Sequence, residues 1–198
     1  MAHRMGVEDK GRETGSVLAL TVADVAAMET PVKGLNAADC AQMAQSAMDS
    51  WGLCGVGIRR ENQWIGVILI APAEGIPRHH PISAGGIDSS TAGIIVVYVD
   101  PDFSLTAMGK RLCVSLCRHL RGQVAGIEAQ ASLSPLTATS LTPGSPWLVQ
   151  MGFHPLRFPV RRYRLSFASL VDWFVDHLHW ARAAIPLTRQ PAPARRTV

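Results

Sequence analysis

The chain has 198 residues, of which 47% are hydrophobic and 17% charged, so it can bury a core and is too apolar to be disordered as a whole. Its longest apolar run, from Trp64 to Ala73, is too short to cross a bilayer. The polar N-terminus also lacks the apolar core of a signal peptide. These features predict a cytoplasmic protein without a membrane partner, whose four cysteines, none in a CxxC pair, are reduced.

The charge is concentrated at one end. The net charge of the chain is +4, and the part from Met151 onward carries eight Arg and two Asp, or +6. Such a basic end fits nucleic acid, an acidic protein or a phosphorylated cofactor. Its last residues lie among Pro and Ala, which favours a solvated tail, so nucleic acid is not an expected partner.

The N-terminal half predicts alternating strands and helices. Residues 1–15 are expected to be a disordered leader, followed by a strand at 16–22 and a short helix ending near Met28. The segment NAADCAQMAQSAMDSWG predicts a helix that Asn36 caps and Gly52 ends. Strands at 55–60 and 64–71 follow, joined by a polar turn, before a Pro-, Gly-, Ser- and His-rich loop at 72–91.

The C-terminal half continues the alternation. A β-branched run at 92–99 predicts a strand covered on both faces, and a helix at 105–120, a strand at 124–132 and a loop to Gly144 come next. A short helix from Ser145, strands at 153–158 and 162–167, and an amphipathic helix from Ser169 precede a disordered basic tail at 188–198. We therefore expect one mixed α/β domain over residues 16–187, whose last helix packs on the domain or pairs subunits into a homodimer.

The stretch VVYVDPDFSLTAMGKRL joins a buried strand to a helix through Asp-Pro-Asp. Gly109 lies in the first turns of that helix, where a glycine costs about 1 kcal/mol relative to alanine. One explanation is a ligand that closely approaches the N–H groups at the helix start. The other is a tight crossing of the helix on a strand, with no ligand.

The same stretch resembles the acetyl-CoA-binding motif of the GNAT superfamily of N-acyltransferases, V-x-P-x-aromatic-(Arg/Gln)-x-x-Gly-x-(Gly/Ala) before a helix with an inward Leu. The agreement is at Val99, Pro101, Phe103, Gly109 and Leu112. The segments CGVGIRRENQWIGVILIAP and SPWLVQMGF also look like parts of that family, so the resemblance covers about residues 17–167. IEAQAS and RRYRL are similar to an actinobacterial subgroup of unassigned substrate.

This resemblance implies a GNAT-like twisted mixed sheet flanked by helices, with an extra C-terminal helix. It implies transfer of an acetyl group from acetyl-CoA, the co-substrate, to a primary amine by direct attack. Backbone groups of Val97, Tyr98 and Val99 would hold the pantetheine arm. The helix start would bind the pyrophosphate through seven residues: Ser104, Leu105, Thr106, Ala107, Met108, Gly109 and Lys110.

Three positions depart from the family pattern. Ser104 replaces the usual Arg or Gln, Ala107 replaces the first Gly, and Leu148 stands where the family has the tyrosine that protonates the departing thiolate. These departures support an alternative function, a catalytically degenerate acyl-CoA-binding or protein-interaction module.

Candidate catalytic groups are few. Glu128, a carboxylate within an apolar strand, is the expected general base, although a structural partner would equally explain it. Tyr98 could supply a hydroxyl or simply pack. No metal site is expected, because Cys113 and Cys117 lie on one side of a helix and His119 lies on another. The sequence does not distinguish a protein lysine, a peptide N-terminus or a small amine as acceptor.

Overall fold

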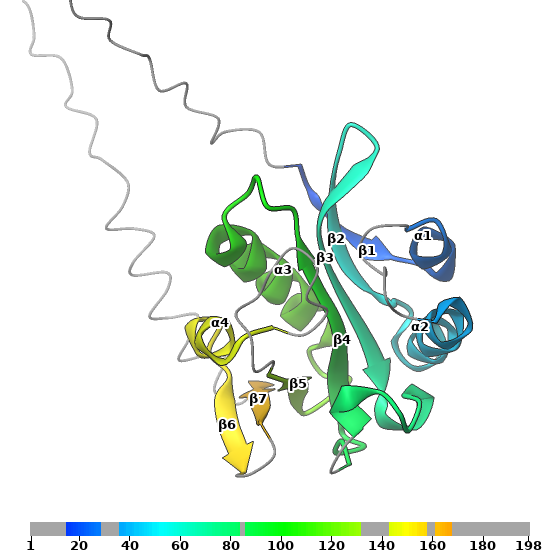
Figure 1. Ribbon diagram of the computed structural model, residues 1–198. Helices are drawn as coiled ribbons and strands as arrows, with labels where there is room; N and C mark the ends of the chain where they lie inside the picture. Colours follow the sequence, from blue (N-terminus) through cyan, green and yellow to red (C-terminus); the bar gives the residue numbers. More distant parts are fainter. Residues whose placement is uncertain (1–14, 29–35, 84–85, 132–142, 158–160, 168–198) are drawn as a thin grey trace, which may run out of the picture.

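The computed structural model describes residues 15–28, 36–83, 86–131, 143–157 and 161–167. These residues form a seven-stranded mixed sheet in the order β1-β2-β3-β4-β5-β7-β6, with helices on both faces (Figure 1). The strands are β1 (Val17–Leu20), β2 (Gly55–Arg60), β3 (Gln63–Pro72), β4 (Thr91–Val99), β5 (Gly126–Gln130), β6 (His154–Arg157) and β7 (Arg162–Ser166). The helices are α1 (Val22–Ala26), α2 (Ala37–Trp51), α3 (Leu105–Leu120) and α4 (Ser145–Gln150), with short 3₁₀ turns η1 (Ala73–Gly75) and η2 (Pro81–Ser83).

Helices α1 and α2 cover one face of the sheet (Figure 1). Thr21 and Asp24 form a capping box at the start of α1, and the Asn36 side chain accepts a hydrogen bond from the Ala38 N–H at the start of α2. Gly52 ends α2 in the left-handed conformation, with φ of 72°. The apolar stripe of α2 packs with Val67 and Leu69 of β3 in one hydrophobic core.

Helices α3 and α4 cover the opposite face. Met108, Leu112, Leu116 and Leu120 form the buried stripe of α3, and they pack on the central strands in a second core. The α3 segment connects β4 to β5, which are paired in parallel; the other strand pairs of the sheet in the described residues are antiparallel. A parallel pair requires such a crossover, which places the start of α3 beyond the C-terminal end of β4.

The mixed α/β fold and the order of its elements up to β7 are confirmed. The expected loop at 72–91 contains η1 and η2, and its residues Ile76 and Ile82 are buried. The strand expected at 124–132 is shorter and spans Gly126–Gln130. The leader up to residue 14, the tail, and the helix expected from Ser169 with its proposed role in a homodimer lie outside the described residues.

Candidate functional site

Strands β4 and β5 separate part of the way along the sheet. Their pairing runs from Thr91 opposite Gly126 to Ile94 opposite Ala129. Beyond this point β4 continues to Val99, as Figure 1 shows, whereas β5 remains paired with β7. Within the described part of the chain, the C-terminal half of β4 therefore has β3 on one side and no strand on the other.

A β-bulge in β4 marks the point of separation. Leu69 lies opposite Val96 and Ile70 lies opposite Ile94, so Ile95 is an extra residue in β4. Ile95 and Val96 consequently both pack in the core beneath α2, where an unbroken strand would place only one of two successive side chains.

The backbone groups of Val97 and Val99 face the open side of β4. Asp100 directly follows β4, and its N–H donates to the carbonyl of Ile65 on β3 with an N···O distance of 2.9 Å. Because backbone groups alternate in direction along an antiparallel strand, those of Tyr98 also point toward β3. Of the three residues predicted to hold the pantetheine arm, Val97 and Val99 therefore present backbone groups to the gap, and Tyr98 does not.

The turn between β4 and α3 leaves part of the helix start unbonded. The Asp100 carboxylate accepts from the Asp102 N–H at 3.0 Å, and Ser104 caps α3 by accepting from the Ala107 N–H at 3.3 Å. The N–H groups of Leu105 and Thr106 form no hydrogen bond within the described residues. They lie at the positive end of the α3 dipole.

The other predicted residues of the helix start differ in accessibility. Ala107 is exposed and Lys110 is half-buried, so both side chains can reach a ligand at the helix start. Met108 is 2% exposed and belongs to the core under α3. Gly109 is buried as well.

The structure supplies a packing reason for Gly109. A Cβ atom built on this glycine would lie 2.6 Å from the indole ring of Trp147 on α4. The same indole N–H donates to the carbonyl of Leu105 at 3.4 Å, and the Thr106 hydroxyl donates to Gln150 Oε1 at 3.2 Å. Helix α4 is thus docked on the first turns of α3, and contact of Gly109 with a cofactor stays a prediction.

Leu148, at the position of the family's tyrosine, is fully buried in the core under α3. It offers no proton to a leaving thiolate.

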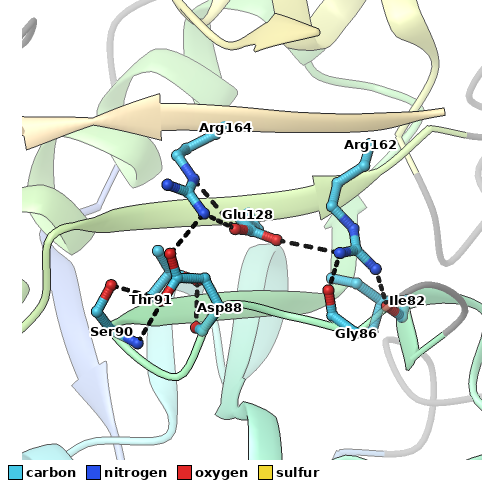
Figure 2. Close-up of polar contacts among 8 residues, drawn as sticks. All are labelled: Ile82, Gly86, Asp88, Ser90, Thr91, Glu128, Arg162 and Arg164. Carbon is cyan, nitrogen blue, oxygen red and sulfur yellow. Dashed lines mark hydrogen bonds and ion pairs between the residues drawn. The ribbon is translucent and has the colours of Figure 1, made fainter. Parts of the chain in front are cut away.

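Glu128 is part of a buried ionic cluster, which Figure 2 shows. Its side chain is 1% exposed. Oε1 accepts two hydrogen bonds from Arg164 of the neighbouring β7, one of them from Nε at 3.0 Å. Oε2 lies 3.6 Å from Nη1 of Arg162, a second β7 residue. The predicted base is therefore an ion-pair partner of two guanidiniums.

The two arginines also hold the connection between β3 and β4 against the sheet (Figure 2). Arg162 donates to the carbonyls of Ile82, at 3.0 Å, and Gly86. Arg164 donates to Asp88 Oδ2 at 2.9 Å. Hydrogen bonds from the Ser90 N–H and hydroxyl, and then from Arg164, lower the pKa of Asp88.

Glu128 and Tyr98, the two predicted catalytic residues, are not brought together. Glu128 lies opposite Gly93, five positions before Tyr98 on β4. At about 3.3 Å per residue this corresponds to roughly 16 Å along the strand. Burial raises the pKa of the Tyr98 hydroxyl, as does nearby Asp100, so this group is protonated at neutral pH and is a weaker acid than an exposed tyrosine. The catalytic role of both residues stays a prediction.

Sequence reasoning missed Trp147, Gln130, Arg162 and Arg164. The alternation of Arg162 and Arg164 is a detectable signal, because side chains two positions apart share one face of a strand. Their pairing with Glu128 depends on the register of β5 and β7, which no local pattern contains.

Among the described residues, no group of three or more His, Cys, Asp and Glu side chains is placed to bind a metal ion. In that part of the chain no helix has the length and hydropathy to span a membrane.

No protein-family model matches the chain, and no curated protein matches its sequence. Solved structures are similar to it. Aminoglycoside acetyltransferase AAC(6')-Ib with coenzyme A and kanamycin has a TM-score of 0.50 and 15% identity, over 79% of this chain and 97% of that one. The same enzyme with paromomycin and acetyl-CoA has a TM-score of 0.51 and 14% identity, over 89% and 98%. A GNAT family acetyltransferase from Brucella melitensis, with acetyl-CoA, has a TM-score of 0.46 and 15% identity, over 76% and 86%.

The seven-stranded mixed sheet with helices on both faces is thus shared with acetyltransferases of known structure, and the predicted fold class is confirmed. The chain has the GNAT-type acyl-CoA N-acyltransferase fold.

Proposed function

We propose that the protein is an N-acetyltransferase of the GNAT superfamily, which transfers the acetyl group of acetyl-CoA to a primary amine. One observation carries this proposal: the open side of β4 leads directly to a helix start whose Leu105 and Thr106 N–H groups have no partner in the described residues. A thin acyl-pantetheine arm suits the first feature, and a pyrophosphate suits the second. The two AAC(6')-Ib structures of this fold are complexes with coenzyme A or acetyl-CoA, in agreement with the proposal.

Acetyl-CoA would lie along β4 with its phosphates at α3. The backbone groups of Val97 and Val99 are free to hydrogen-bond the arm and to polarise the thioester carbonyl. Leu105 and Thr106 would donate to the pyrophosphate, with the Lys110 ammonium adding positive charge. The exposed methyl group of Ala107 permits the phosphates to approach.

The amine would attack the thioester carbonyl directly, without a covalent enzyme intermediate. Because Leu148 is apolar and buried, protonation of the departing thiolate falls to water or to Tyr98. General acid help is typically worth about 100- to 10,000-fold, so its loss slows the reaction without preventing it.

A second candidate function is an acyl-CoA-binding module without catalysis. Two observations favour it: Leu148 lies in the core, and Glu128 is engaged by two arginines. The two functions share the cofactor site and differ only in turnover.

Calorimetric titration of the protein with acetyl-CoA, followed by a thiol-release assay with a panel of primary amines, tests both. The four cysteines are buried, and burial raises the pKa of Cys54 to about 11, so background thiol reactivity should be low. Binding with amine-dependent thiol release supports the enzyme. Binding without release on any amine supports the module, and absence of binding refutes both.

A further inference from the structure

Gln130 carries a buried hydrogen-bond acceptor that the folded chain does not use. Its Oε1 atom is inaccessible to solvent and has no hydrogen-bond partner among the described residues. Most buried polar side-chain atoms in proteins have at least one partner, and leaving one unsatisfied costs about 1–3 kcal/mol. The Gln130 side chain as a whole is half-buried, so rotation of its amide can bring this acceptor to a ligand that carries a donor.

The position of Gln130 connects this acceptor with the proposed reaction. Gln130 is the last residue of β5 and directly follows Ala129, where the pairing with β4 ends. Ile127 and Ala129 pack in the core under α3. Side chains alternate along a strand, so Gln130 shares the opposite face with Glu128, and it is the first residue of β5 beyond the pairing with β4.

Two carboxylates and two guanidiniums near Gln130 pair with one another. Glu128 from β5 and Asp88 from the β3–β4 connection are paired with Arg162 and Arg164 from β7. His80, next to η2, is buried, and burial lowers its pKa. Asp39 of α2 lies on the same side and contacts His79 at 2.9 Å. The carboxylates nearest Gln130 are thus held by arginines, and neither is an unpaired base.

Glu128 is also poorly placed to take a proton from an ammonium. Protonation would remove the charge that holds Arg162, whose side chain is 9% exposed, and weaken a buried ion pair. Arg164 would keep only Asp88 as a carboxylate partner. Glu128 is the one buried carboxylate of the described residues.

We infer, on the basis of the proposed function, that the acceptor is a primary amine with a substantial uncharged fraction at neutral pH, such as the α-amino group of a peptide or amino acid, and that Gln130 Oε1 accepts a hydrogen bond from it. A neutral primary amine has two N–H donors and one lone pair. One donor goes to Gln130 and the lone pair attacks the thioester.

The transfer balances without a further reactant. A bond forms between the amine nitrogen and the acetyl carbonyl carbon, and the C–S bond breaks with its electron pair leaving on sulfur. The nitrogen loses one proton and the thiolate gains one, directly or through water. The products are an N-acetyl amide and the free thiol of coenzyme A.

The class of amine makes a large difference. An α-amino group ordinarily has a pKa of about 7.8 and a lysine side chain one of about 10.4, so about 14% of the former but only about 0.04% of the latter are uncharged at pH 7. The greater nucleophilicity of the more basic amine offsets part of this difference of about 350-fold. We expect kcat/KM to favour the α-amine by at least about tenfold.

The test uses the full chain, acetyl-CoA and two peptides. One has a free α-amine and no lysine; the other is the same sequence with an acetylated N-terminus and one added lysine. The inference predicts that log kcat/KM rises with pH and levels near pH 8 for the first peptide and near pH 10 for the second, because the titrating group belongs to the substrate. If kcat/KM levelled at the same pH for both peptides, the titrating group would be a base of the enzyme. If the two peptides had equal kcat/KM at pH 7, the enzyme would not select the α-amine. Either result overturns the inference and leaves the proposed function standing.

Gln130→Leu tests the hydrogen bond itself. It removes an unsatisfied buried acceptor, so the variant should unfold at the same or a higher urea concentration. It should bind acetyl-CoA with unchanged affinity. Its kcat/KM for the α-amine peptide should fall at least about tenfold. Gln63→Leu, at an exposed position of β3, is the matched control and should retain full activity. Reduced stability with unchanged kcat/KM would make Gln130 a structural residue and overturn its role. Failure of the wild-type protein to bind acetyl-CoA refutes the proposed function, and this inference with it.

Discussion

The indole of Trp147 lies against the backbone of Gly109, 38 residues earlier in the chain, and occupies the space that any other side chain at position 109 would need. Alanine there should be worth about 1 kcal/mol in helix propensity, but its methyl group would displace the ring, and overpacking typically costs about 1–3 kcal/mol. Gly109→Ala should therefore lower the free energy of unfolding, measured by urea denaturation. In a Trp147→Leu background the same change should be neutral or stabilising. Stabilisation by alanine with Trp147 present would show that the ring does not constrain this position.

Ala107 is a cleaner probe of the cofactor site than Gly109, because it is exposed and its replacement displaces nothing. A glutamate in the first turn of α3 favours the helix through the dipole by about 0.3–1 kcal/mol, yet it repels a pyrophosphate. Ala107→Glu should hence be at least as stable as the wild type and should bind acetyl-CoA at least about tenfold more weakly in calorimetry. The matched control is Arg118→Glu, an exposed charge change in the last turn of the same helix. Equal affinities of Ala107→Glu and wild type would place the phosphates elsewhere.

Glu128→Gln separates a structural from a catalytic carboxylate. Removing one partner of a buried ion pair typically costs about 3–5 kcal/mol. The buried Arg162 loses the charge of Glu128, whereas Arg164 keeps Asp88. The variant should unfold with a free energy lower by about 3 kcal/mol. Its kcat, measured well below the unfolding transition, should change less than tenfold. The exposed Glu74→Gln controls for loss of charge alone. A folded, stable variant with kcat reduced 100-fold or more would instead support Glu128 as general base.

His80 should make stability depend on pH on the acid side. Burial, followed by nearby His79, lowers the pKa of His80 from its ordinary value of 6.5, although Asp39 acts in the opposite direction. The unfolded chain binds a proton at this residue as the pH falls below about 6.5, and the folded chain resists it, so stability falls with pH in this range. His80→Asn can keep an acceptor for the Ile82 N–H and should lose less stability between pH 7.5 and 5.5. His119→Asn, at an exposed position, should behave as the wild type. Identical losses in all three proteins would contradict this account.

The sequence alone determined the elements and the local features that begin and end them. The Asp-Pro-Asp turn, the Asn36 cap and the Gly52 terminus depend on contacts within a few residues, and each is present in the folded chain. The apolar stripes of α2 and α3 are likewise local, since their spacing is set by the helical repeat. Together with the resemblance of the strand–turn–helix segment, these features were sufficient to predict the fold.

Only the tertiary structure decided what surrounds the candidate site. The bulge at Ile95 is hidden in a continuous β-branched run, because such a run shows no alternation that an extra residue could interrupt. The pairing of Glu128 with Arg162 and Arg164 follows from the register of β5 against β7, and the contact of Trp147 with Gly109 from the docking of α4 on α3. The ion pairs of Glu128 and the contact of Trp147 with Gly109 each join residues more than 30 positions apart. The proximity of these residues depends on how whole elements pack. The sequence predicted Glu128 as a base and Gly109 as a ligand contact. In the folded chain each also has a packing partner, and the two predicted roles stay predictions.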